Sequence, residues 1–256
     1  EAAVGARPCQ AAPRMSAKGK GSSSGLALCD ALAGMDRPRL ADYCAAAAEY
    51  IRSASTATAS QQKIAQVQLS NSLAAITLAD LRDRLGLKMP LAVAGEREVG
   101  GGLRSVQADV SEMTPTDGLT LAIEIKPVHL AIGRAVWNRF GDIRTFAVNI
   151  HLKFPFAVIG GIMTLPTEER VKSGDDEKWK STAGLIARAS DRFSRAGSRR
   201  TEAEAAHLLE GIAVVAFDHK TGLIDSGIPP AGKGLRWEEF IEAIATAYEA
   251  RFGDVS

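Results

Sequence analysis

The sequence has few cysteines, little bias of charge and no long apolar run. Its 256 residues include three cysteines, Cys9, Cys29 and Cys44, whose positions show no metal-ligand spacing. A sparse and odd number of cysteines argues against a disulfide framework and indicates a reducing, cytoplasmic compartment. The formal net charge is +1, so contact with a polyanion must come from a local patch. No apolar segment is long enough to cross a bilayer, and we expect no membrane partner.

Signals of processing and of nucleotide hydrolysis are also missing. The first residues contain neither a Met nor the basic-then-apolar pattern of a signal peptide, and Met15 is a candidate internal start. Three glycines at 100–102 are not followed by the Lys-Ser/Thr pair that a phosphate-binding loop needs. Helicase and ATPase motifs are absent as well, so the sequence predicts no nucleotide-driven motor.

The order of segments predicts three regions. Residues 1–25 are rich in Ala, Gly, Ser and Lys without a period, and we expect them to be disordered. Residues 26–90 predict helices over Leu26–Ser55 and Thr58–Leu85, from apolar side chains at helical spacing. This helical region would pack on the core or, alternatively, form a dimerisation or clamping arm. Residues 91–256 predict an α/β core that closes with a C-terminal helix.

One predicted strand, Leu119–Pro127, organises the core. Its apolar residues alternate with Thr120, Ala122, Glu124 and Lys126, so this second set shares the other face. A second strand is predicted over Arg104–Ser111, and the Pro-Thr-Asp-Gly turn at 115–118 joins the two as an antiparallel hairpin.

This hairpin brings Asp109 toward Glu124 and Lys126. Two carboxylates and a lysine at a strand end can bind a hard divalent cation and position a water, and carboxylate oxygens suit Mg²⁺. Asp117 is an alternative partner of Glu124, but it lies where the turn itself needs a turn-forming residue. We therefore favour Asp109.

A long amphipathic helix over His129–Leu152 and a nearly continuous apolar strand over Phe154–Pro166 follow the hairpin. Asp109, fourteen intervening residues and then Glu124-Ile125-Lys126 resemble the motif of the PD-(D/E)XK nuclease superfamily, to which many type II restriction endonucleases belong. Ala108 stands where the family name has proline. The order of hairpin, helix and buried strand is similar to that family's core, a mixed central sheet flanked by helices.

The resemblance implies a Mg²⁺-dependent endonuclease that cuts double-stranded DNA. Asp109, Glu124 and the backbone carbonyl of Ile125 would bind the metal, and Lys126 would orient the water or stabilise developing charge. Relatives carry a further glutamate on a helix before the first strand, and Glu98 or Glu96 is the candidate for this role. A type II enzyme implies a homodimer and a companion DNA methyltransferase encoded nearby. The alternatives are a repair or defence nuclease without strict sequence specificity, and a DNA-binding protein that does not cut.

The remaining sequence predicts a surface loop over Thr167–Lys180 and a helix over Ser181–Arg195. Arginines at helical spacing along and beyond this helix are candidate DNA contacts: Arg188, Arg192, Arg195, Arg199 and Arg200. Thr201 and Glu204 match a capping box, which predicts a helix to about Glu210. A buried strand over 211–218 and a last helix over Trp237–Phe252 complete the prediction, and the isolated histidines His207 and His219 are expected to be structural.

Overall fold

The computed structural model describes residues 26–173 and 176–253. The disorder predicted for residues 1–25 therefore concerns residues outside the described ranges. Helices precede the sheet: α1 (Ala27–Ala33), α2 (Leu40–Ser53), α3 (Ala59–Leu85) and the short 3-10 helix η1 (Gly86–Lys88). The region predicted as one helix over Leu26–Ser55 is two helices, because Pro38 lies between them and disfavours helical backbone at the residue before it.

The longest helix, α3, begins and ends as its sequence predicts. Thr58 and Gln61 form a capping box in which each side chain accepts a hydrogen bond from the other residue's backbone N–H. Gly86 follows the helix with φ of 64°, a conformation that is strained for residues with a Cβ. Both signals are local, which explains why the bounds of this helix were predictable.

Five strands form the central sheet in the order β1-β2-β3-β4-β7. Their bounds are β1 (Val93–Gly100), β2 (Ser105–Thr114), β3 (Gly118–Pro127), β4 (Val158–Pro166) and β7 (Gly211–Phe217). The first three strands are antiparallel neighbours, whereas β3, β4 and β7 run parallel. Helix α4 (Ile132–His151) makes the crossover from β3 to β4. The chain is therefore α/β, with a mixed sheet flanked by helices.

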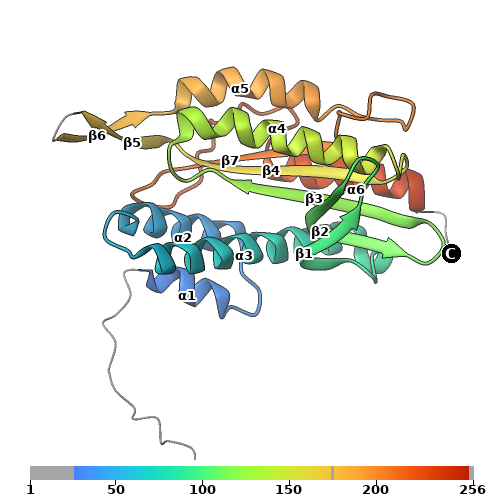
Figure 1. The fold of residues 1–256 in the computed structure, drawn as a ribbon, viewed down its shortest axis with the longest axis horizontal. Coiled ribbons are helices and arrows are strands. Elements are labelled where there is room, and N and C mark those ends of the chain that lie inside the picture. The colour runs from blue at the N-terminus through green and yellow to red at the C-terminus, as the bar shows by residue number, and fades with distance from the viewer. Residues whose placement is uncertain (1–25, 174–175, 254–256) are drawn as a thin grey trace, which may run out of the picture.

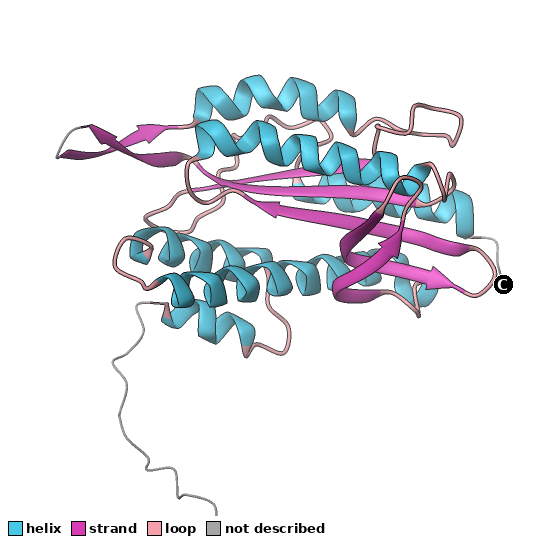
Figure 2. Cartoon of the chain, viewed as in Figure 1, coloured by secondary structure: helices cyan, strands magenta, loops and turns pink. Residues whose placement is uncertain are grey.

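Helices cover both faces of this sheet (Figures 1 and 2). Helix α4 and α5 (Ala183–Ala196) cover one face, while α2, α3 and α6 (Trp237–Phe252) cover the other, and α1 packs on the outer side of α2 and α3. The buried residues divide accordingly into two clusters, one on each side of the sheet. Because the first cluster includes side chains from α1, α2, α3, α6 and the sheet, the N-terminal helices share a core with the strands.

Later parts of the chain also depart from the prediction. The expected surface loop over 167–180 contains a two-stranded hairpin, β5 (Glu168–Ser173) and β6 (Asp176–Ser181), which projects from the end of the molecule nearest the start of α5 (Figure 1). β1 lies where a charged turn or a helix was expected. Residues 201–210 form turns instead of a helix.

Those turns use the predicted capping residues differently. The Glu204 carboxylate accepts hydrogen bonds from the backbone N–H groups of Arg200 and Thr201, so it caps a turn. The backbone N–H of Arg199 donates to the carbonyl of Leu209, and the N–H of Leu209 donates to the carbonyl of Ala196, which closes the segment into a loop. Within the described residues, no helix has the length and apolar character that crossing a membrane would require.

Candidate active site

Asp109 and the Glu124-Ile125-Lys126 segment lie together on the neighbouring strands β2 and β3. The backbone N–H of Ile125 donates a 2.7 Å hydrogen bond to Oδ2 of Asp109. Glu124 and Lys126 flank Ile125 in the chain, and they form an ion pair between Oε1 of Glu124 and Nζ of Lys126. Asp109 and Glu124 are 8% and 7% exposed, whereas the Lys126 side chain keeps 26% of its surface in solvent. The predicted convergence of the two carboxylates and the lysine is therefore present.

A β-bulge in β1 shapes the other side of this cluster. Ala94 pairs with Val110 and Arg97 pairs with Ala108, so Gly95 and Glu96 together lie opposite Asp109. Gly95 has φ of 114°, which a residue with a side chain rarely adopts. Burial is the main cause of the raised pKa of Asp109, and the nearby negative charge of Glu96 adds to the increase. A glycine within an otherwise charged strand is the sequence signal that marks this bulge.

Burial raises the pKa values of both carboxylates, because it disfavours their charged forms. Burial raises the pKa of Asp109, although the N–H of Ile125 and the ammonium of Lys126 oppose the shift. Burial raises the pKa of Glu124 to about 7, despite the opposing effect of Lys126 and with further increases from Asp109 and Asp142. A bound divalent cation would supply the missing positive charge.

The donor set fits a hard cation such as Mg²⁺. Asp109 and Glu124 provide carboxylate oxygens, and Ile125 lies between them at the cavity. No three Asp, Glu, His or Cys side chains gather as a metal site within the described ranges. Mg²⁺ is usually held by one or two carboxylates and keeps several waters, so this set of ligands suits it.

The cluster opens onto a cavity of about 1190 Å³. Asp109, Ile125, Lys126 and Glu96 line one side of it, and Arg139 of α4 lines another. The facing wall comes from one side of α3, with these lining residues: Lys63, Gln66, Val67, Ser70 and Asn71. These positions recur at steps of three and four along the helix, as one face does. Sequence reasoning missed them because nothing local tells a polar helix face that borders a cavity from one that faces solvent.

His129 fixes the end of β3 to its neighbours. The residue was predicted to begin a helix, but it lies before α4, is buried, and lines the same cavity. Its Nε2 is 3.2 Å from both the Tyr43 hydroxyl and Oγ1 of Thr164, which lie 2.8 Å from each other. Burial lowers the pKa of His129 to about 4, so the ring is neutral near pH 7. This network joins α2, the end of β3 and β4.

Two other predicted acids lie elsewhere. Glu98 is on β1 rather than on a helix, is exposed, and is not among the residues lining the cavity, whereas Glu96 is. Asp117 lies in the β2–β3 turn at the opposite end of β3 from Glu124, and its carboxylate accepts hydrogen bonds from the Thr114 and Thr116 hydroxyls. Of the two candidate glutamates, Glu96 therefore lies beside Asp109, and the Asp117 carboxylate bonds within its own turn.

The predicted arginine stripe divides into two groups. Arg188, Arg192 and Arg195 on α5 are exposed, as is Arg200 beyond it. The prediction of Arg199 as a DNA contact is wrong. Its side chain is buried, with 1% of its surface exposed, and its guanidinium donates a 2.9 Å hydrogen bond to Oε1 of Glu210. Helix α5 ends at Ala196, so Arg199 and Arg200 follow the helix, as the sequence predicted.

The chain matches no known protein-family model, and neither the curated proteins nor the solved structures contain a match to it. The interpretation of this site therefore depends on its geometry and chemistry.

Proposed function

We propose that the chain is a Mg²⁺-dependent endonuclease that hydrolyses DNA phosphodiester bonds, with Asp109, Glu124 and Lys126 at its active site. The observation that carries this proposal is the contact between the Asp109 carboxylate and the backbone N–H of Ile125, between Glu124 and Lys126. It brings the Asp109 carboxylate next to the ion pair of Glu124 and Lys126, and Asp109 and Lys126 both line one cavity.

The order of elements supports the same proposal. Helix α3, the antiparallel strands β1, β2 and β3, the crossover helix α4 and the parallel strand β4 follow one another along the chain. This is the order expected of the restriction-endonuclease-like core, with Asp109 on the second strand and Glu124 and Lys126 on the third. The agreement supports a family proposal that the short motif alone would support weakly.

Each side chain of the site has a separate role in this proposal. Asp109, Glu124 and the Ile125 carbonyl would hold Mg²⁺, which when bound supplies Lewis-acid polarisation of the phosphate and lowers the pKa of a coordinated water. Glu124 holds the Lys126 ammonium at the cavity, where its N–H groups can orient a water and stabilise negative charge on the phosphate oxygens. The exposed arginines of α5 would contact DNA phosphates.

Among such enzymes we favour a type II restriction endonuclease that acts as a homodimer, with a companion methyltransferase encoded nearby. The helices around the core offer surfaces for sequence recognition. A repair or defence nuclease of the same fold is the second enzymatic candidate. A DNA-binding protein that does not cut is favoured by one observation, which is that Glu124 and Lys126 already neutralise each other as an ion pair.

The test is incubation of the purified chain with a large unmethylated DNA, in Mg²⁺ and in EDTA. Discrete Mg²⁺-dependent fragments are expected. A Mg²⁺-dependent smear would support the proposed active site and would indicate non-specific cleavage instead of restriction at a defined sequence. Binding without cleavage on double-stranded, single-stranded and branched DNA would contradict the nuclease proposal.

A further inference from the structure

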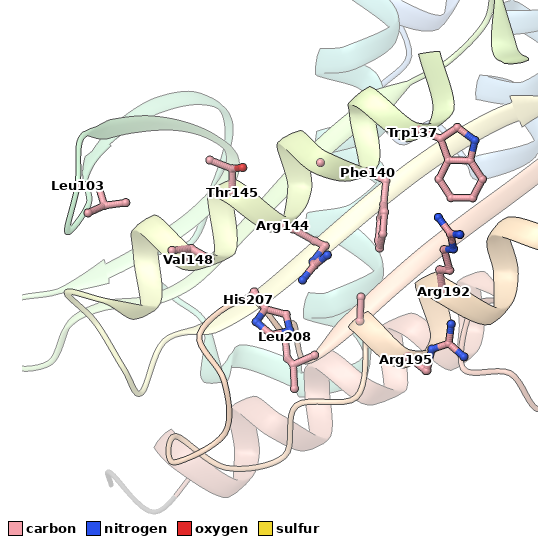
Figure 3. Close-up of a pocket in the computed structure, with 12 residues that line it drawn as sticks. Leu103, Trp137, Phe140, Arg144, Thr145, Val148, Arg192, Arg195, His207 and Leu208 are labelled. Carbon is pink, nitrogen blue, oxygen red and sulfur yellow. The ribbon is translucent and has the colours of Figure 1, made fainter. Parts of the chain in front are cut away.

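A second cavity, of about 970 Å³, lies between α4 and α5. It shares no lining residue with the cavity at Asp109, because the two use opposite sides of α4. Ala135 and Arg139 face the first cavity, whereas Trp137, Phe140 and Arg144 face the second (Figure 3). The α4–α5 cavity is therefore separate from the proposed active site.

The lining of this second cavity combines apolar walls with positive charge. Leu103, Trp137, Phe140, Val148 and Leu208 supply apolar surface. Arg144, Arg192 and Arg195 bring guanidinium groups, and His207 adds a ring that can donate a hydrogen bond. No Asp or Glu lines the cavity, and none of these arginines has an ion pair with any residue in the described part of the chain.

Arg144 is the most buried of the three arginines that line this cavity. Its Nε is buried and has no hydrogen-bond partner among the described residues, although its guanidinium lies 5.9 Å from the centre of the Phe140 ring. A buried donor without a partner is costly, and native proteins rarely keep one without a reason. Figure 3 shows the Arg144 side chain extending from α4 into the space where His207 and Leu208 also lie. The guanidinium of Arg144 therefore lies at the cavity, where its charge would attract an anionic group of a ligand.

Trp137 offers a complementary surface. Its indole is half-buried, and the guanidinium of Arg192 lies 4.8 Å from the ring centre, which is a cation–π contact. Arg192 therefore lies over the Trp137 ring, so a positive charge and an aromatic side chain are held together at this part of the cavity. Arginine pairs with phosphate through two parallel hydrogen bonds and also stacks on planar rings.

We propose that the α4–α5 cavity binds a nucleotide, with its 5′-phosphate at Arg144 and Arg192 and its base against the aromatic wall. The two sources of such a group are a free nucleotide and the phosphorylated end of a single strand. The proposal goes beyond the nuclease function, since the cavity and its residues are separate from Asp109, Glu124 and Lys126.

Calorimetric titration of the full chain in EDTA tests the site, with dAMP, deoxyadenosine and inorganic phosphate as probes. We expect dAMP to bind at least about tenfold more tightly than either of the others, because only dAMP uses both the cations and the aromatic wall. Equal affinity for dAMP and deoxyadenosine would overturn the role of the arginines. Equal affinity for dAMP and phosphate would overturn the role of Trp137.

Variants separate this site from the rest of the surface. Arg144→Gln and Arg192→Gln should each weaken dAMP binding by about tenfold or more, whereas Arg134→Gln, an exposed arginine on α4 outside both cavities, should bind as the wild type does. Arg192 is exposed, so its variant keeps the test valid if Arg144→Gln does not fold. Unchanged affinity in both cavity variants would refute the proposal.

Two further arms identify the source and separate the two proposals. A 5′-phosphorylated single-stranded oligonucleotide that binds more tightly than dAMP, and more tightly than its 5′-hydroxyl form, would identify a strand end. Tighter binding of dAMP would identify a free nucleotide. Lys126→Met should leave dAMP binding unchanged, so loss of cleavage and loss of nucleotide binding are distinguishable outcomes.

Discussion

The two sides of α4 border different cavities, one beside buried carboxylates and one lined by arginines. On one side, Asp109 and Glu124 are carboxylates whose pKa values are raised by burial. On the other side, Arg144, Arg192 and Arg195 gather around an apolar cavity without a carboxylate among its lining residues. The first arrangement suits a cation and the second suits an anion, so the same helix borders two sites of different chemistry.

The largest expected effect is on cleavage. Lys126→Met should lower the rate of DNA cleavage by about 100-fold or more, because it removes a donor aimed at developing charge. DNA affinity measured in EDTA should stay within about twofold of the wild type. The Arg134→Gln variant serves as the control, and cleavage at the wild-type rate by Lys126→Met would remove the lysine from the mechanism.

The next effect tests the correction made for Arg199. Arg199→Gln should lower the free energy of unfolding by about 3 kcal/mol, because it leaves Glu210 with one buried partner fewer. Glu210 retains Arg251 and His151, which limits the loss. Urea denaturation measures this change. A fully stable variant with weakened DNA binding would instead restore Arg199 to the DNA-contacting group.

Glu124 should make stability depend on pH in the absence of metal. Its pKa rises from 4.5 in the unfolded chain to about 7 in the folded protein, so the folded state binds more protons between these values. The free energy of unfolding should therefore fall as pH rises from about 4.5 to about 7, and the penalty remains above that window. Glu124→Gln should be more stable than the wild type by about 1–3 kcal/mol at pH 8 in EDTA, and about equal to it at pH 4.

With Mg²⁺ present, the Glu124 carboxylate should stabilise the folded protein instead of destabilising it. Added Mg²⁺ should raise the melting temperature of the wild type at pH 8, because a ligand that binds only the folded state stabilises it. The rise should be much smaller in Glu124→Gln and in Asp109→Asn. An equal rise in all three proteins would place the metal elsewhere.

The smallest expected effect concerns the exposed arginines. Arg188→Gln should weaken DNA binding a few-fold and reduce the slope of log affinity against log salt by about 0.9, the value for one lost phosphate contact. Binding measured by fluorescence anisotropy at several salt concentrations gives both quantities. An unchanged slope would mean that this part of α5 faces solvent in the complex.

The elements with simple periodicity could be predicted from the sequence, and the irregular ones could not. Strand β3 alternates, α4 has an apolar stripe and β7 is a short apolar run, so each was predicted within a few residues. Strand β1 is an exposed edge with a bulge, and its sequence from Glu96 to Glu98 is charged on both faces. It therefore lacks the alternation that would have identified it.

The site was predictable only in part for the same physical reason. Asp109 and Glu124 are joined by a short hairpin, so the turn determines their proximity. Contacts between distant segments carry no such signal, as with Lys63 and Gln66 facing Lys126 across the cavity. Arg199 illustrates the same limit, because its place after the helix was predicted but its burial against Glu210, eleven residues further along the chain, was not.

The bulge at Gly95 also has a consequence for assembly. Strand β1 is one edge of the sheet, and its bulge and charged residues hinder pairing with a strand from another copy. At the opposite edge, β7 is covered by the chain's own loop, through backbone hydrogen bonds from Val214 to Leu235 and from Asp225 to Ala216. With both edges protected, the sheet resists extension into larger aggregates. Two copies would then meet through helices or loops, leaving the strands that carry Asp109 and Glu124 undisturbed.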